Sequence, residues 1–309
     1  MHTLERVRGF LEAAPDSQAR RLPHNRTAAR SDAECMTTAI LENITSSPLD
    51  IPRCDVLGVE VSAVNMQMAV HQIHEWIARR QRNYVCITGV HGVMDSQRDP
   101  LLKHIHNQAG MVTPDGMPMV WVNKLRGNAH VSRVYGPDLM LEVCNLSLRR
   151  QWKHYFYGGA EGVADLLAER LCERFPGLEV AGTHCPPFRT LSEEEDRAVV
   201  QTINASGADI VWVGLSTPKQ EFWMHQHLGR IHAPVMVGVG AAFDFHAGLK
   251  AQAPRWMQKN GLEWFYRLCC EPRRLWKRYL KNNPLFVWNL AMQSLGVKDF
   301  TAPPVTEYL

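Results

Sequence analysis

The middle of the chain decides the fold: residues 154–181 read HYFYGGAEGVADLLAERLCERFPGLEVA. An apolar aromatic stretch at 154–157 is followed by two glycines, a helix-spaced apolar pattern at 162–175 and an alternating stretch at 178–181. These periodicities predict a strand, a helix and a second strand. Because the helix carries the chain back to the edge where the first strand began, the two strands are expected to be parallel.

The same alternation extends in both directions along the chain. We expect further strands at 84–88, 210–213 and 235–239, and further helices at 93–107, 139–149 and 193–206. Ser192 and Glu195 have the spacing of a capping box at the start of the last helix. The predicted fold class is therefore α/β: a Rossmann-like, largely parallel sheet flanked by helices, with a C-terminal helical appendage.

Length and composition are those of a globular protein with one large or two modest domains. The chain has 309 residues, of which 45% are hydrophobic and 21% charged. No apolar run approaches the ~20 residues of a spanning helix, and the N-terminus lacks the apolar run of a secretory signal, so we expect a cytoplasmic protein. None of the eight cysteines forms a C-x-x-C pair, and we expect reduced thiols in the core.

The composition divides the chain into four segments. Residues 1–54 mix charged, polar and proline residues without a sustained period, which predicts a weakly ordered extension or short helices. Residues 55–250 carry the α/β pattern, 251–295 form the appendage and 296–309 form a tail. Within the appendage, helical segments are expected to break at the prolines, which lack a backbone donor: Pro254, Pro272 and Pro284.

Positive charge is concentrated in the appendage. Between Arg255 and Lys281, eight basic and two acidic residues give a net charge of +6, whereas the whole chain carries +3. Basic residues interleaved with Trp and Tyr are typical of a helix that lies on an anionic lipid surface. A solvated helix packed on the core by its aromatic side chains, or a phosphate-binding edge, would carry the same pattern. The small total charge does not indicate a nucleic-acid partner.

Five polar or glycine-rich segments follow predicted strands or apolar runs. Ligands of parallel α/β sheets bind beyond the carboxyl ends of the strands, and glycines there let the backbone approach a phosphate. Each glycine pair alone is equally typical of a plain tight turn. The segments are Thr88-Gly89-Val90-His91-Gly92, Thr113-Pro114-Asp115-Gly116, Tyr157-Gly158-Gly159, the run 214–221 (GLSTPKQE) and the run 238–244 (GVGAAFD).

Residue types exclude some chemistries and leave others open. Gly238-x-Gly240 is followed by Phe243 where a dinucleotide fingerprint requires a third glycine, which disfavours a dehydrogenase. The histidines are not spaced as metal ligands, so no metal site is predicted. Asp115, between Pro114 and Gly116, is interpreted either as a general base or as an Asx turn or cap for a helix that starts at Met117.

The ordered series of motifs resembles the WecG/TagA/CpsF glycosyltransferases, glycosyltransferase family 26, over residues 55–290. Each motif alone is weak, but their common order makes coincidence improbable. The series comprises Thr-Pro-Asp-Gly at 113–116, Arg133 with Gly136, Tyr-Gly-Gly at 157–159, Pro-Lys-Gln-Glu at 218–221, the run 238–245, Ala253-Pro254, Gly-Leu-Glu-Trp at 261–264 with Arg267, and Glu-Pro-Arg-Arg at 271–274 before Arg278-Tyr279-Leu280.

This resemblance implies an inverting glycosyltransferase that needs no metal and no cofactor. It would move an N-acetylmannosamine-type sugar, or a related hexose or uronic acid, from a UDP-sugar to a polyprenyl-diphosphate-linked saccharide. The product would feed exopolysaccharide and cell envelope biosynthesis. The enzyme would be cytoplasmic and peripheral on the inner face of the cytoplasmic membrane. The sequence leaves the oligomeric state open, although self-association as a homo-oligomer before membrane docking would hide the apolar face of the appendage.

The resemblance also implies roles for individual residues. Asp115 becomes the general base, with Thr88 as a second catalytic residue. His91 stands where many members have asparagine in this loop, and we expect it to take that place. Substrate contacts are carried over to His91, Arg133, Gly158, Gly159, Gly214, Pro218, Gln220, Glu221, Gly240 and Asp244. Diphosphate or acceptor contacts are carried over to Arg267, Arg274 and Arg278.

Two rival functions make different predictions. A nucleotide-dependent oxidoreductase would explain the glycines but not the basic aromatic appendage. A non-catalytic peripheral membrane protein would explain the appendage but would release no UDP from any UDP-sugar.

Overall fold

The structure is a computed structural model that describes residues 50–301. These residues belong to one compact unit, 48–309, which contains both the predicted α/β domain and the predicted appendage. The extension predicted for 1–54 falls outside the described residues up to position 49, as does the end of the predicted tail from position 302.

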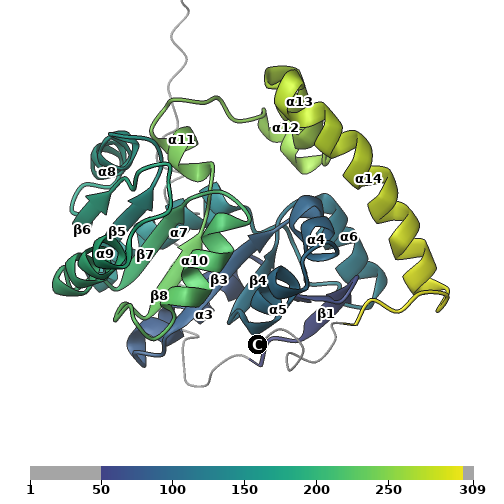
Figure 1. The fold of residues 1–309 in the computed structure, drawn as a ribbon, viewed down its shortest axis with the longest axis horizontal. Coiled ribbons are helices and arrows are strands. Elements are labelled where there is room, and N and C mark those ends of the chain that lie inside the picture. The colour runs from purple at the N-terminus through teal and green to yellow at the C-terminus, as the bar shows by residue number, and fades with distance from the viewer. Residues whose placement is uncertain (1–49, 302–309) are drawn as a thin grey trace, which may run out of the picture. The chain divides into compact units, whose positions relative to one another are not determined.

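A six-stranded parallel sheet forms the centre of the described unit, with helices on both of its faces (Figure 1). Its strand order is β4 (Met111–Pro114), β3 (Asn83–Thr88), β8 (Val235–Gly238), β7 (Ile210–Gly214), β5 (Lys153–Gly158) and β6 (Glu179–His184). β3 leads outward to β4 on one side and β5 leads outward to β6 on the other, with β7 and β8 between them. The α/β class predicted from the sequence is confirmed.

The flanking helices follow the periodicity of the sequence. Trp212, Phe156 and Tyr84 are fully buried in the central strands, as expected for a sheet covered on both faces. Helices α3 (Met66–Ala78), α7 (Gly136–Arg150), α8 (Val163–Arg174), α9 (Glu193–Ala205), α10 (Lys219–His227) and α11 (Ala242–His246) surround the sheet. The capping box of α9 is present, with both reciprocal bonds between Ser192 and Glu195.

Some element boundaries differ from the prediction. The helix expected at 93–107 is two helices, α4 (Val90–Ser96) and α5 (Pro100–Gln108), because Asp99 caps α5 ahead of a proline that disfavours helical geometry before it. A hairpin of β1 (Arg53–Val56) and β2 (Val59–Ser62), not predicted, packs beside β4.

The expectation that the cysteines are core thiols is only partly right. Cys54, Cys86 and Cys144 are free and buried, whereas Cys172, Cys269 and Cys270 are free and exposed and Cys185 is half-buried. Cys35 lies outside the described residues. The exposed ones lie on amphipathic helices, where the spacing of cysteines alone does not reveal the face.

The appendage forms three helices: α12 (Arg255–Lys259), α13 (Glu263–Cys270) and α14 (Pro272–Ser294). Pro254 and Pro272 lie at helix starts as predicted, but the break predicted at Pro284 is wrong, since α14 continues through it. Helix α14 packs on α4, and its Leu275 and Phe286 are buried; burial of these side chains offsets the backbone hydrogen bond lost at Pro284. Across residues 50–301, the structure contains no helix with the length and apolarity needed to cross a membrane.

Candidate functional site

A crevice of about 1160 Å³ runs along the carboxyl edge of the sheet. Each of the five sequence segments contributes to it, through His91, Asp115, Gly159, the loop 214–220 and the loop 238–244. They follow β3, β4, β5, β7 and β8 respectively. Because β3 and β5 lead outward in opposite directions, the crevice lies where parallel α/β sheets bind their ligands.

Asp115 lies at one end of this crevice, directly after β4. Its backbone N–H donates to the carbonyl of Thr88 at 3.0 Å, and its side chain is 24% exposed. Helix α6 (Met117–Leu125) has Gly116 and not Asp115 as its N-cap, so the interpretation of Asp115 as the cap of this helix is wrong. Instead, Asp115 Oδ1 accepts from Arg133 Nη2 at 3.4 Å.

The surroundings of Asp115 favour a proton acceptor at this position. Burial raises the pKa of the Asp115 carboxyl above its ordinary value; Arg133 and Arg267 oppose this rise, and the Glu263 carboxylate adds to it. A carboxylate with a raised pKa binds a proton more readily than a surface carboxylate. The site therefore contains a candidate general base that is partly accessible from the crevice.

Two arginines of the appendage line the same end of the crevice. Arg267 on α13 and Arg278 on α14 both contribute to the lining, together with His91 at the start of α4. Burial lowers the pKa of His91 to about 3, and Arg278 and Arg267 contribute to this shift. His91 is therefore a neutral imidazole beside two cations. The side chain of Arg274 lies outside what the structure describes.

The glycines that end β5 and β7 approach each other closely. Gly158 has a φ of +129°, and a Cβ there would lie 2.6 Å from the backbone of Gly214. The N–H of Gly159 donates to the carbonyl of Gly214 at 3.0 Å. Gly158 thus shapes the turn, while Gly159, Gly214 and Gly240 line the crevice.

The first turn of α10 places two predicted residues at different depths. Gln220 is 3% exposed and lines the crevice, and its Oε1 has no hydrogen-bond partner among the described residues. Glu221 is fully buried and accepts from Thr217 Oγ1 at 2.9 Å and from Gln220 Nε2 at 3.1 Å. Glu221 therefore orients its neighbours, whereas Gln220 faces the ligand space, as do Pro218 and Asp244.

Four of the predicted residues lie behind the crevice surface rather than on it. As far as residues 50–301 define the lining, it does not include Thr88, Arg133, Gly158 or Glu221. Thr88 is 1% exposed, and its hydroxyl has no partner within the described part of the chain. These side chains can act on a bound ligand only through the residues in front of them.

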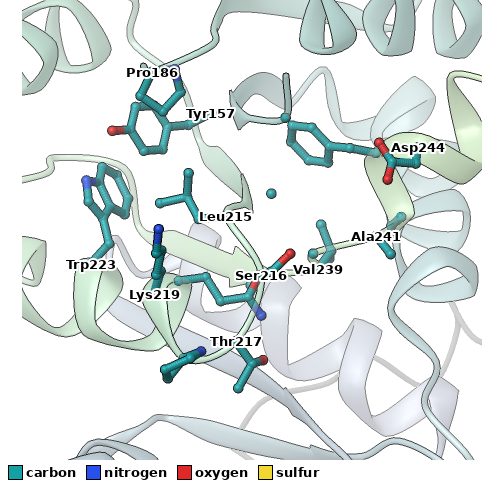
Figure 2. A pocket seen from close by; sticks show the side chains of 18 of the residues that line it. Tyr157, Pro186, Leu215, Ser216, Thr217, Lys219, Trp223, Val239, Ala241 and Asp244 are labelled. Carbon is teal, nitrogen blue, oxygen red and sulfur yellow. The ribbon is translucent and has the colours of Figure 1, made fainter. Parts of the chain in front are cut away.

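The other end of the crevice is aromatic. Tyr157 stacks on Trp223 with ring centroids 4.4 Å apart, and Trp223 stacks on His227 at 4.2 Å. Figure 2 shows Tyr157, Pro186 and Trp223 on one side of the pocket and Asp244 on the opposite side, with Leu215 and Ser216 between them. Because Trp223 is stacked by both Tyr157 and His227, these rings form a packed aromatic wall of the crevice.

Sequence reasoning missed two charged residues of the site. Lys250, which lines the crevice, pairs with Asp244 at 2.7 Å and lies 3.7 Å from Glu271, and no motif indicated it. Glu263 accepts from Arg133, and its place in the Gly-Leu-Glu-Trp motif was the one signal that could have found it.

A parallel α/β sheet with glycine turns at its carboxyl edge, and a crevice lined by a carboxylate and two arginines, are typical of α/β enzymes that bind phosphorylated ligands. The family model described as "Glycosyl transferase WecG/TagA/CpsF family" matches residues 54–299, and the chain belongs to this family. It is therefore a glycosyltransferase, as the resemblance predicted.

Two similar proteins carry the same name, N-acetylglucosaminyldiphosphoundecaprenol N-acetyl-beta-D-mannosaminyltransferase. The one from Bacillus spizizenii is 33% identical over 186 residues, which cover 60% of this chain and 70% of the relative. The one from Staphylococcus aureus strain NCTC 8325 is 26% identical over 248 residues, which cover 80% of this chain and 95% of the relative.

Proposed function

We propose that the chain transfers an N-acetylmannosamine-type sugar from a UDP-sugar to a polyprenyl-diphosphate-linked saccharide with inversion at the anomeric carbon. The names of the relatives support the type of sugar and the lipid-linked acceptor. The observation that carries the proposal is the position of Asp115, partly exposed in a crevice that Arg267 and Arg278 also line.

The reaction is a single displacement. The acceptor hydroxyl attacks the anomeric carbon of the donor sugar while Asp115 takes its proton, and the bond from that carbon to the diphosphate oxygen of UDP breaks. One displacement inverts the configuration and needs no covalent enzyme intermediate. Arginine guanidinium groups, with five N–H donors each, supply the charge stabilisation of the diphosphates without a metal ion.

The donor occupies the part of the crevice above β5, β7 and β8. The uracil lies towards the aromatic wall of Tyr157 and Trp223, and the glycine turns at 159 and 214 allow the diphosphate to approach the backbone. Gln220 and Asp244 bind hydroxyl groups of the sugar or ribose. The unpartnered Oε1 of Gln220 is consistent with a ligand donor at that position.

The acceptor enters from the appendage. A second groove, about 300 Å³, lies between α13 and α14 and is lined almost wholly by apolar atoms. Leu268 and Tyr279 of this groove directly follow Arg267 and Arg278 of the main crevice in sequence. We assign the acceptor diphosphate to the two arginines and the first prenyl units to this groove, so that residues 55–250 hold the donor and 251–295 the acceptor.

The outer face of α14 docks on the inner face of the cytoplasmic membrane in this proposal. Leu280, Val287 and Trp288 are each more than 60% exposed, and the basic residues of α14 precede the last two in its first half, at 273–281. Exposed apolar side chains next to Lys and Arg are typical of helices that lie in the interface of an anionic membrane.

The proposal is tested by a screen of UDP-sugars with a short-chain polyprenyl-diphosphate-GlcNAc acceptor, in which UDP release is measured. We expect release with UDP-N-acetylmannosamine or a related donor, dependent on the acceptor and retained in EDTA. Binding of NAD(P) without binding of UDP would favour the oxidoreductase. Vesicle binding without UDP release from any donor would favour the non-catalytic membrane protein.

A further inference from the structure

The guanidinium of Arg133 is shared between two carboxylates from distant parts of the chain. Its Nη2 donates to Asp115 Oδ1 at 3.4 Å and also to Glu263 Oε2, the shorter of the two contacts. The three side chains are largely buried, with exposures of 15% for Arg133, 24% for Asp115 and 13% for Glu263. The structure thus places Asp115 and Glu263 in competition for one nitrogen of Arg133.

Local packing holds this arrangement in place. The guanidinium carbon of Arg133 lies 4.0 Å from the centre of the Tyr135 ring, which fixes the plane of the side chain. The turn before α13 packs on α6, since a Cβ at Gly261 would lie 3.1 Å from the Cβ of Met117. Glu263 therefore reaches Arg133 from a docked segment of the appendage.

The sharing of the Arg133 guanidinium between Asp115 and Glu263 matters, because a carboxylate held by both donors of one arginine is a poor base. An arginine bound closely to an aspartate stabilises its ionised form and lowers its affinity for a proton. The Nε of Arg133 has no partner among the described residues, so its full fork is not engaged by Asp115. If Glu263 were absent, Arg133 would be free to turn both of its donors towards Asp115.

We propose that Glu263 is a positioning residue that draws Arg133 partly away from Asp115 and so keeps that carboxylate competent as a proton acceptor. This inference rests on the proposed function, in which Asp115 is the general base. It adds a link between the appendage and the chemistry, because the base is fully active only when α13 is docked. The appendage would then supply a carboxylate for tuning as well as the cations Arg267 and Arg278.

The electrostatic surroundings agree with the geometry. The charged or titratable groups near Asp115 and its two partners are Arg133, Glu263, Arg267, Tyr135, Asp138 and His91. Burial raises the pKa of Asp115 and the negative charge of Glu263 raises it further, against the opposing effect of the two arginines. Loss of the Glu263 charge would therefore lower the pKa of Asp115, and a closer Arg133 would lower it again.

The test is the pH dependence of kcat/KM for UDP release in Glu263→Gln. On the acid side the rate falls as Asp115 becomes protonated, so a lower pKa moves this limb to lower pH. We expect a shift of about one pH unit, the size of one neighbouring charge. The plateau should fall roughly tenfold, because a less basic carboxylate accepts the proton less readily.

Three further variants make the result decisive. Glu263→Asp keeps the charge and should keep the acid limb close to that of the parent protein, which also covers the case in which Glu263→Gln folds poorly. Asn282→Ala removes a buried contact between Arg98 and α14 and loosens the docking of the appendage without touching Asp115. Its plateau should fall, and its acid limb should move in the same direction as that of Glu263→Gln but by less, because Glu263 keeps its charge and the appendage still docks part of the time.

The third variant, Asp115→Asn, separates the two ideas. If it retains normal turnover, the general base is wrong and the proposed mechanism fails with it. If it loses turnover but the acid limb of Glu263→Gln does not move, the mechanism stands and Glu263 is only a structural contact.

Discussion

The two ends of the crevice are built in different ways. At the aromatic end, the backbone itself forms the site: Gly158 packs against Gly214, and the buried Glu221 holds Gln220 in place. At the Asp115 end, the site consists of long charged side chains that two separate segments bring together. In the proposed function, the aromatic end holds the donor and is preorganised by the fold, whereas the Asp115 end holds the acceptor and depends on side chains that the appendage supplies.

The largest effect is expected at the acceptor end. Asp115→Ala should lower turnover by roughly 10²- to 10⁴-fold, the range for loss of a general base, while UDP still binds at the unchanged donor end. Steady-state UDP release and calorimetric titration of UDP measure the two quantities. Glu173→Gln removes an exposed carboxylate of similar kind on α8 and should leave both unchanged. Near-normal turnover of Asp115→Ala would show that the chemistry does not depend on the Asp115 end of the crevice.

At the donor end, substitution of a turn glycine should mainly lower the free energy of unfolding. Gly158→Ala places a side chain at positive φ and against the backbone of Gly214, and we expect a loss of more than about 2 kcal/mol in the free energy of unfolding. Gly177→Ala is the matched control, because its φ is +95° but nothing lies within 4 Å of the added Cβ. It should cost only about 1 kcal/mol. If urea denaturation gives the same loss of unfolding free energy for Gly158→Ala and Gly177→Ala, the close approach of Gly158 to Gly214 does not contribute to stability.

Substitution of Arg267 should shift the pKa of Asp115 in the direction opposite to that expected for Glu263→Gln. Its charge lowers the pKa of Asp115, so Arg267→Gln should raise that pKa and move the acid limb of kcat/KM to higher pH. Loss of a guanidinium at the diphosphate should also raise KM for the acceptor about tenfold and leave KM for the donor unchanged. Arg273→Gln, on the exposed side of α14, serves as the control. An effect on the KM for the donor alone would contradict the assignment of Arg267 to the acceptor diphosphate.

The smallest effect is expected on the outer face of α14. Trp288→Ser removes an apolar ring that is 61% exposed, and affinity for vesicles with anionic lipid should fall by a few-fold. UDP release with a short-chain acceptor in detergent-free buffer should not change, because this side chain lies outside both grooves. Flotation of the protein with vesicles measures the binding. Unchanged flotation would contradict membrane docking through this face.

The donor end could be read largely from the sequence. Gly158, Gly214 and Gln220 stand in short motifs directly after apolar runs, and the parallel arrangement of strands brings such positions to one edge. The order of the strands could not be read in this way, because local periodicity carries no information on which strands are neighbours.

The acceptor end could be read only in part. The contact of Arg133 with Glu263 joins residues far apart in sequence, and each of them alone is typical of a surface charge. Pro284 predicted a break where α14 continues, since the packing of Phe286 is not visible in a single sequence. Glycines and periodicity mark backbone-built sites, whereas sites assembled from long side chains depend on tertiary docking.

The anomeric configuration of the product tests the mechanism most directly. If Asp115 acts as a base in a single displacement, proton NMR of the product should show the configuration opposite to that of the sugar in the UDP donor. Retention of configuration would contradict this account, because it would require a second displacement and a different role for the carboxylate at position 115.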